Sequence, residues 1–116
     1  MKVVLVARDA APSRAFSKLA PVLQESGFDA DLLVGDGKPL IEGEIINLVE
    51  RANIVVLGMS SSENLARPEI LAGETAKKWG IPYGFYGDVR RCWARARAGA
   101  WFEDLASRTS FYFGIT

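Results

Sequence analysis

The residues best suited to chemistry in this chain are arginines, aspartates and serines that follow short apolar runs. Because the 116 residues include no His and a single Cys, the sequence excludes a Ser-His-Asp triad, a Cys-His dyad, a His-ligated zinc site and a disulfide framework. Carboxylates remain as candidate acids and bases, and arginines with hydroxyls remain as candidate ligands for an anion. We expect no metal ion and no cofactor.

The first of three polar segments extends from Arg8 to Arg14. Pro12 suits the first turn of a helix, so the free backbone N–H groups of a helix start would lie beside the two arginines. This predicts a binding site for a phosphate or a carboxylate, with Ser13 as the available hydroxyl and Asp9 as a candidate acid or base. The alternative is a simple helix start with two solvated arginines.

The second polar segment contains three consecutive serines between Gly58 and Asn64. Ser60 and Ser61 would form a hydrogen-bonding cradle for a polar ligand. Ser60 and Glu63 also have the spacing of a capping box, in which each side chain satisfies the other residue's backbone N–H. The two roles are compatible, because a helix start that needs a cap also attracts anions.

The third polar segment follows Gly87. Asp88 suits a helix N-cap and is the second candidate acid or base, and Arg90 and Arg91 fall in the first helical turn. Cations are unfavourable at the positive end of a helix dipole, so this pair indicates a bound anion or an acidic partner. In the alternative interpretation, both guanidinium groups face water or pair with Glu103 and Asp104.

The elements that must position these segments are short apolar strands separated by amphipathic helices. The predicted strands are 3–7, 31–34, 53–57, 82–86 and 110–113. Apolar residues at helical spacing between them predict helices around 16–23, 41–52 and 70–79, with Gly27 ending the first helix through a positive φ.

This alternation predicts a single α/β domain over residues 1–116, a three-layer αβα sandwich around a five-stranded parallel sheet. The sheet is either Rossmann-like, with strand order 3-2-1-4-5, or flavodoxin-like, with order 2-1-3-4-5. In both orders the first strand borders the point where strand order reverses, so the three polar segments line a cleft there. No covering helix follows the last strand, which predicts the N-terminal part of a longer protein; the alternative is a domain that naturally ends on its edge strand.

The strand at 3–7, the loop with Pro12 and the helix that carries Pro21 resemble the N-terminal domain of GT-B glycosyltransferases, especially the UDP-N-acetylglucosamine 2-epimerase type. The resemblance covers mainly the segment that ends near residue 25. It implies the acceptor-side domain of a sugar-nucleotide-dependent glycosyltransferase or epimerase, which is inactive alone because a second domain holds most of the nucleotide sugar. Any enzymatic role would therefore be part of such an enzyme.

The alternative function is a stand-alone flavodoxin-like module that binds an anion or another protein. It would have no phosphotransfer activity, because Leu57-Gly58-Met59 stands where a receiver domain needs a phosphorylatable Asp. The expected partners are an anionic or sugar-type small molecule, together with a second domain or a second copy in a homodimer.

Charge and hydropathy indicate where the protein is located and which partners it has. Lys and Arg balance Asp and Glu at 14 each, and the apolar run after Lys2 is too short for a signal peptide or a membrane span. We therefore expect a cytoplasmic protein with no membrane span. Nucleic-acid binding is not expected, because of the three tryptophans only Trp93 lies within the arginine cluster at 90–97.

Overall fold

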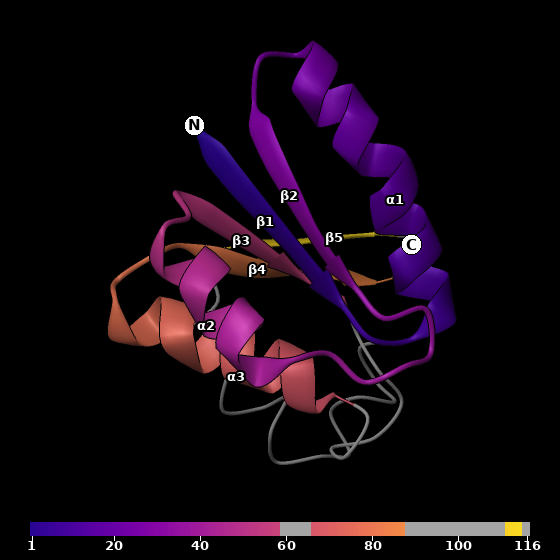
Figure 1. The fold of residues 1–116 in the computed structure, drawn as a ribbon. Helices are drawn as coiled ribbons and strands as arrows, with labels where there is room; N and C mark the ends of the chain where they lie inside the picture. Colours follow the sequence, from indigo (N-terminus) through magenta and orange to yellow (C-terminus); the bar gives the residue numbers. More distant parts are fainter. Residues whose placement is uncertain (59–65, 88–110, 115–116) are drawn as a thin grey trace.

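The computed structural model of the chain describes residues 1–58, 66–87 and 111–114 (Figure 1). Strands and helices alternate through most of these ranges. In chain order they are β1 (Lys2–Ala7), α1 (Ala10–Glu25), β2 (Asp29–Val34), α2 (Glu42–Glu50), β3 (Ile54–Leu57), α3 (Arg67–Lys78), β4 (Tyr83–Gly87) and β5 (Phe111–Gly114). This alternation confirms the prediction of an α/β domain.

The strands form a parallel sheet in which β1 has a neighbour on each side. It pairs in parallel with β2 and with β3, and β4 pairs in parallel with β3. The backbone of β5 pairs in turn with β4 in parallel. Because all these pairings are parallel, the carboxyl ends of the strands lie at one edge of the sheet.

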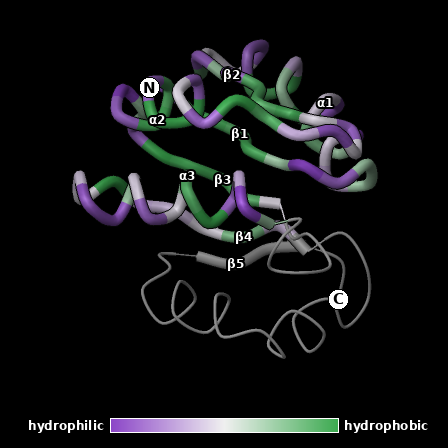
Figure 2. Tube along the Cα trace, turned by 60° about the horizontal axis from the view of Figure 1, so that its bottom comes forward, coloured by the Kyte–Doolittle hydropathy of each residue, from purple (hydrophilic) through white to green (hydrophobic). Residues whose placement is uncertain are grey.

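The apolar run of β1 is buried on both of its faces. Val3 and Leu5 pack with Phe16 of α1, whereas Val4 and Val6 belong to the cluster formed with α2 and α3. Successive strand residues point to opposite faces, so residues 3–7, which are covered on both sides, are all apolar. α1 therefore covers one face of the sheet and α2 with α3 the other, with the hydrophobic strands β1 and β3 between them (Figures 1 and 2).

β2 begins two residues before its predicted start at Asp31. The backbone N–H of Asp29 donates to the carbonyl of Met1 at 3.0 Å, and Asp29 is the register partner of Lys2. The β1 ladder therefore extends into a segment that is not apolar. Lys2 Nζ lies 2.9 Å from a carboxylate oxygen of Asp31, which adds a partly exposed ion pair across the two strands.

α1 continues through Pro21 to Glu25 as one helix. Gly27 follows its C-cap with a φ of 92°, which confirms the predicted glycine ending of the helix.

The start of α1 packs closely against the end of β3. The backbone N–H of Gly58 donates to the carbonyl of Val6 at 2.8 Å. A Cβ atom at Gly58 would lie 2.8 Å from Cβ of Pro12 and 2.9 Å from Cβ of Ala7, both closer than van der Waals contact allows. Pro12 is itself fully buried, so neither neighbour has open space into which it can move.

We expect Gly58→Ala to lower the free energy of unfolding by roughly 1–3 kcal/mol, because overpacking forces neighbouring atoms apart. The matched control is Gly43→Ala in α2, where a Cβ atom meets nothing within 4 Å. That change should raise stability by about 0.4–1 kcal/mol, because alanine is the better helix former. Urea unfolding of both variants measures the difference, and an unchanged midpoint for Gly58→Ala would contradict the close contact.

Candidate functional site

The loop after β1 is shorter than the sequence predicted. Only Arg8 and Asp9 lie between β1 and α1, and Ser13 already donates its backbone N–H to the carbonyl of Asp9 at 3.1 Å. The remaining residues up to Arg14 belong to α1. The helix start and its first N–H groups, which have no acceptor within the helix, therefore lie directly at the carboxyl end of β1.

Arg8 is held mainly through its backbone. Its N–H donates to Oε1 of Glu69 at 2.9 Å, and its carbonyl accepts the N–H of Gly37 at 2.7 Å. Its guanidinium group lies 3.5 Å from a carboxylate oxygen of Asp9, and both side chains are largely buried. The Arg8 cation thus already has an anionic neighbour within the protein.

Asp9 is the N-cap residue of α1, with an extended backbone at φ −71° and ψ 157°. Its carboxylate makes no side-chain capping bond to the helix and lies beside the Arg8 guanidinium group instead. The first turn of α1 contains no acidic residue. The positive end of this helix dipole is therefore not offset by an acidic side chain of its own first turn.

Ser13 joins three segments through one hydroxyl group. Its Oγ donates to the carbonyl of Ala7 at 3.2 Å and accepts the backbone N–H of Asp36 at 3.1 Å. The residue is only 2% exposed. These bonds tie the end of β1, the first turns of α1 and the β2–α2 loop together, so the hydroxyl has a structural role in addition to any contact with a ligand.

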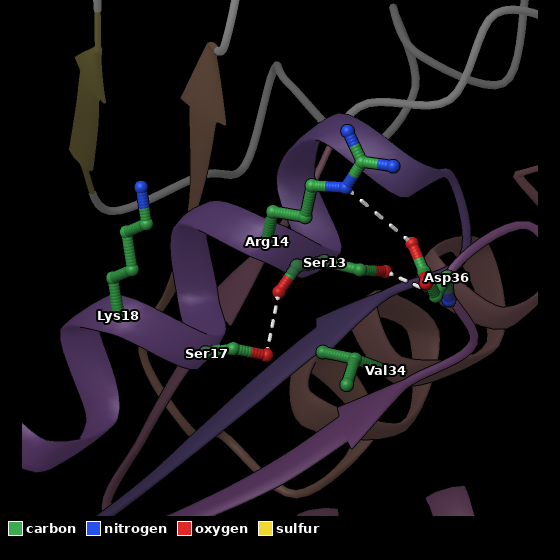
Figure 3. Close-up of a pocket in the computed structure, with 6 residues that line it drawn as sticks. All are labelled: Ser13, Arg14, Ser17, Lys18, Val34 and Asp36. Atoms are coloured by element: carbon green, nitrogen blue, oxygen red, sulfur yellow. Dashed lines mark hydrogen bonds and ion pairs between the residues drawn. The ribbon is translucent and has the colours of Figure 1, made fainter.

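A cavity of about 340 Å³ opens beside this junction, between α1 and the end of β2 (Figure 3). We call it the α1 cavity. It is lined by Ser13, Arg14, Ser17, Lys18, Val34 and Asp36.

Arg14 and Lys18 supply the positive charge of the α1 cavity, and both extend from the same side of α1 (Figure 3). Residues four apart on a helix are neighbours, so these two cations repel each other weakly. Arg14 Nε lies 3.9 Å from Oδ1 of Asp36, with side chains 76% and 65% exposed. Within the described part of the chain, no ion pair is formed by Lys18.

The structure brings together four of the predicted site residues. Arg8, Asp9, Ser13 and Arg14 all lie at the carboxyl end of β1 or in the first turns of α1. The other five lie outside the described residues: Ser60, Ser61, Asp88, Arg90 and Arg91.

Sequence reasoning did not select Glu69, although its carboxylate contacts the predicted site. Glu69 lies in the first turn of α3 and is fully buried. With Ala72, Gly73 and Ala76 it forms a buried stripe at helical spacing. A carboxylate within an apolar stripe was the feature of the sequence that could have identified Glu69 as a buried polar contact. Burial of such a group requires hydrogen-bond partners, and the Arg8 N–H is one of them.

Two charged residues that line the α1 cavity were also missed as ligands. Lys18 was detectable as the cation one helical turn beyond Arg14, and Asp36 as the carboxylate between two glycines after β2. Over the described ranges, no group of three or more Cys, Asp or Glu side chains is placed to bind a metal ion. None of the helices described there is long and apolar enough to cross a membrane.

No protein-family model matches this chain, and no curated protein matches it. What the chain does must therefore be inferred from its own residues.

We expect Glu69→Ala to lower the free energy of unfolding by about 1–3 kcal/mol, because it leaves the Arg8 N–H without its side-chain acceptor. Glu69→Gln keeps an acceptor oxygen and should lose less. Glu74→Ala, on the exposed side of the same helix, controls for helix propensity and should change little. Chemical denaturation distinguishes these variants, and equal effects of Glu69→Ala and Glu74→Ala would refute the anchoring role.

Proposed function

We propose that this chain is a flavodoxin-like domain that binds a small anionic ligand in the α1 cavity. The observation that carries the proposal is that Arg14 and Lys18, two exposed cations one turn apart, line the same cavity near the start of α1. An anion between them would relieve their mutual repulsion and accept charge-assisted hydrogen bonds from both.

The flavodoxin-like assignment is supported by the neighbours of β1. Its pairing with β2 and β3 fits the order 2-1-3-4-5. In the order 3-2-1-4-5, the first strand lies between the second and the fourth. The α1 cavity lies at the carboxyl end of the first strand, on its β2 side, whereas the switch point of the order 2-1-3-4-5 lies between the first and third strands.

The size of the α1 cavity suits a small ligand. Its volume of about 340 Å³ is near the lower end of the range for small-molecule sites. Val34 provides an apolar surface, and the polar groups come from α1 and Asp36. A phosphate or a small phosphorylated compound matches this volume and charge.

The proposal predicts that inorganic phosphate shifts the amide resonances of residues lining the α1 cavity in a titration of the ¹⁵N-labelled chain. Arg14→Ala combined with Lys18→Ala should weaken binding about tenfold or more, since two charge-assisted bonds are removed. Arg51→Ala combined with Lys78→Ala removes the same charge at the helix ends on the opposite edge of the sheet, and should leave binding nearly unchanged. If both double variants lost phosphate affinity equally, net charge alone would explain the effect, and the proposed site would be wrong.

A second candidate function is the acceptor-side domain of a GT-B glycosyltransferase or epimerase. It is favoured by one specific feature, the helix α1 that follows β1 and contains Pro21. Its activity would need a second domain or a second copy of the chain. UDP-N-acetylglucosamine added in the same titration tests it: shifts around the β1–α1 junction at lower concentrations than phosphate requires are expected, and shifts no greater than those from phosphate would count against it.

A further inference from the structure

The α1 cavity is lined by a carboxylate as well as two cations, and these groups together restrict which ligands fit it. Asp36 lies beside Arg14, with 3.9 Å between Oδ1 and Nε (Figure 3). This distance is too long for a hydrogen bond, and ion pairs between such exposed side chains contribute little to stability. Both groups therefore keep hydrogen-bonding capacity for a ligand.

The position of Asp36 is fixed by its backbone. Its φ is 48°, and its N–H donates to the buried Ser13 hydroxyl. It lies in a turn closed by the Lys38 N–H, which donates to the Gly35 carbonyl at 3.0 Å. A Cβ atom at Gly35 would collide with the Lys38 carbonyl oxygen, so the turn depends on that glycine. The backbone that carries this carboxylate is consequently fixed at the rim of the cavity.

The donor and acceptor chemistry of the lining is complementary. Arginine and lysine only donate hydrogen bonds, and an ionised carboxylate only accepts them. A bare phosphate satisfies Arg14 and Lys18 but is repelled by Asp36. A ligand that satisfies all three has an anionic group at one end and hydroxyl groups at the other.

We infer that the α1 cavity binds a phosphorylated sugar, with Arg14 and Lys18 contacting the phosphate and Asp36 accepting hydrogen bonds from sugar hydroxyls. The C–H surface of the sugar would lie against Val34, the apolar lining residue. This inference rests on the proposed anion binding and adds the class of ligand. No covalent step is involved.

The experiment is a comparison of three probes on the ¹⁵N-labelled full chain: inorganic phosphate, ethyl phosphate and ribose 5-phosphate. Ribose 5-phosphate should bind about tenfold more tightly than ethyl phosphate, because only it offers hydroxyls to Asp36. Asp36→Asn removes a negative charge and is tolerated at positive φ. It should strengthen phosphate and ethyl phosphate binding slightly while reducing the advantage of ribose 5-phosphate several-fold.

Asp29→Asn is the matched control, since it removes the same charge from an exposed position at the opposite end of β2. It should leave the preference for ribose 5-phosphate intact. Opposite responses of the two phosphate classes to Asp36→Asn cannot arise from a general loss of folding, and a dispersed amide spectrum checks the fold directly.

The outcomes separate the two proposals. If none of the probes shifts the cavity resonances, the anion site itself is wrong, and the inference about its ligand falls with it. If all three bind with similar affinity, or if Asp36→Asn leaves the ribose 5-phosphate preference unchanged, anion binding stands and the sugar-binding role of Asp36 is overturned.

Discussion

The peptide backbone just after β1 is the point on which the described site depends. The Arg8 N–H is held by the Glu69 carboxylate of α3, and the Arg8 carbonyl is held by the N–H of Gly37 after β2. A chain segment that leaves the centre of a sheet has no further ladder partners, so its polar groups need others. Here one bond comes from α3 and the other from the loop after β2, which together fix the direction in which α1 begins.

Because the backbone direction after β1 is fixed, the first turn of α1 can pack closely against its neighbours. α1 starts at Ala10, and its first turn brings Pro12 against Gly58 and the Ser13 hydroxyl against the Ala7 carbonyl. Each contact tolerates little displacement, because the first has no room for a methyl group and the second is a buried hydrogen bond. The junction of β1 and α1 is therefore a rigid support on which the exposed side chains of Arg14 and Lys18 are placed.

Sequence patterns predicted the elements well, because burial of β1 on both faces and the helical spacing of apolar residues are local properties. They also predicted that Arg8, Asp9, Ser13 and Arg14 would gather at one strand end. The Glu69 contact was missed because its partner lies 61 residues away in sequence and only tertiary packing unites them. The length of the β1–α1 loop was overestimated because a proline suits several positions of a first helical turn, and Pro12 is the third helical residue rather than the first.

The location of the cavity follows from the same packing. The expected crevice lay among the strand ends of β1, β3 and β4, but Pro12 and Gly58 are in close contact between α1 and β3. On the other side of β1, Asp36 has a left-handed backbone in the β2–α2 turn, which contacts α1 through the Ser13 hydroxyl and the long Arg14 ion pair. Space therefore remains between α1 and the end of β2, where five of the six lining residues are polar or charged. The tight contact between Pro12 and Gly58 closes one side of the start of α1, so the α1 cavity and its charged side chains lie on the other side.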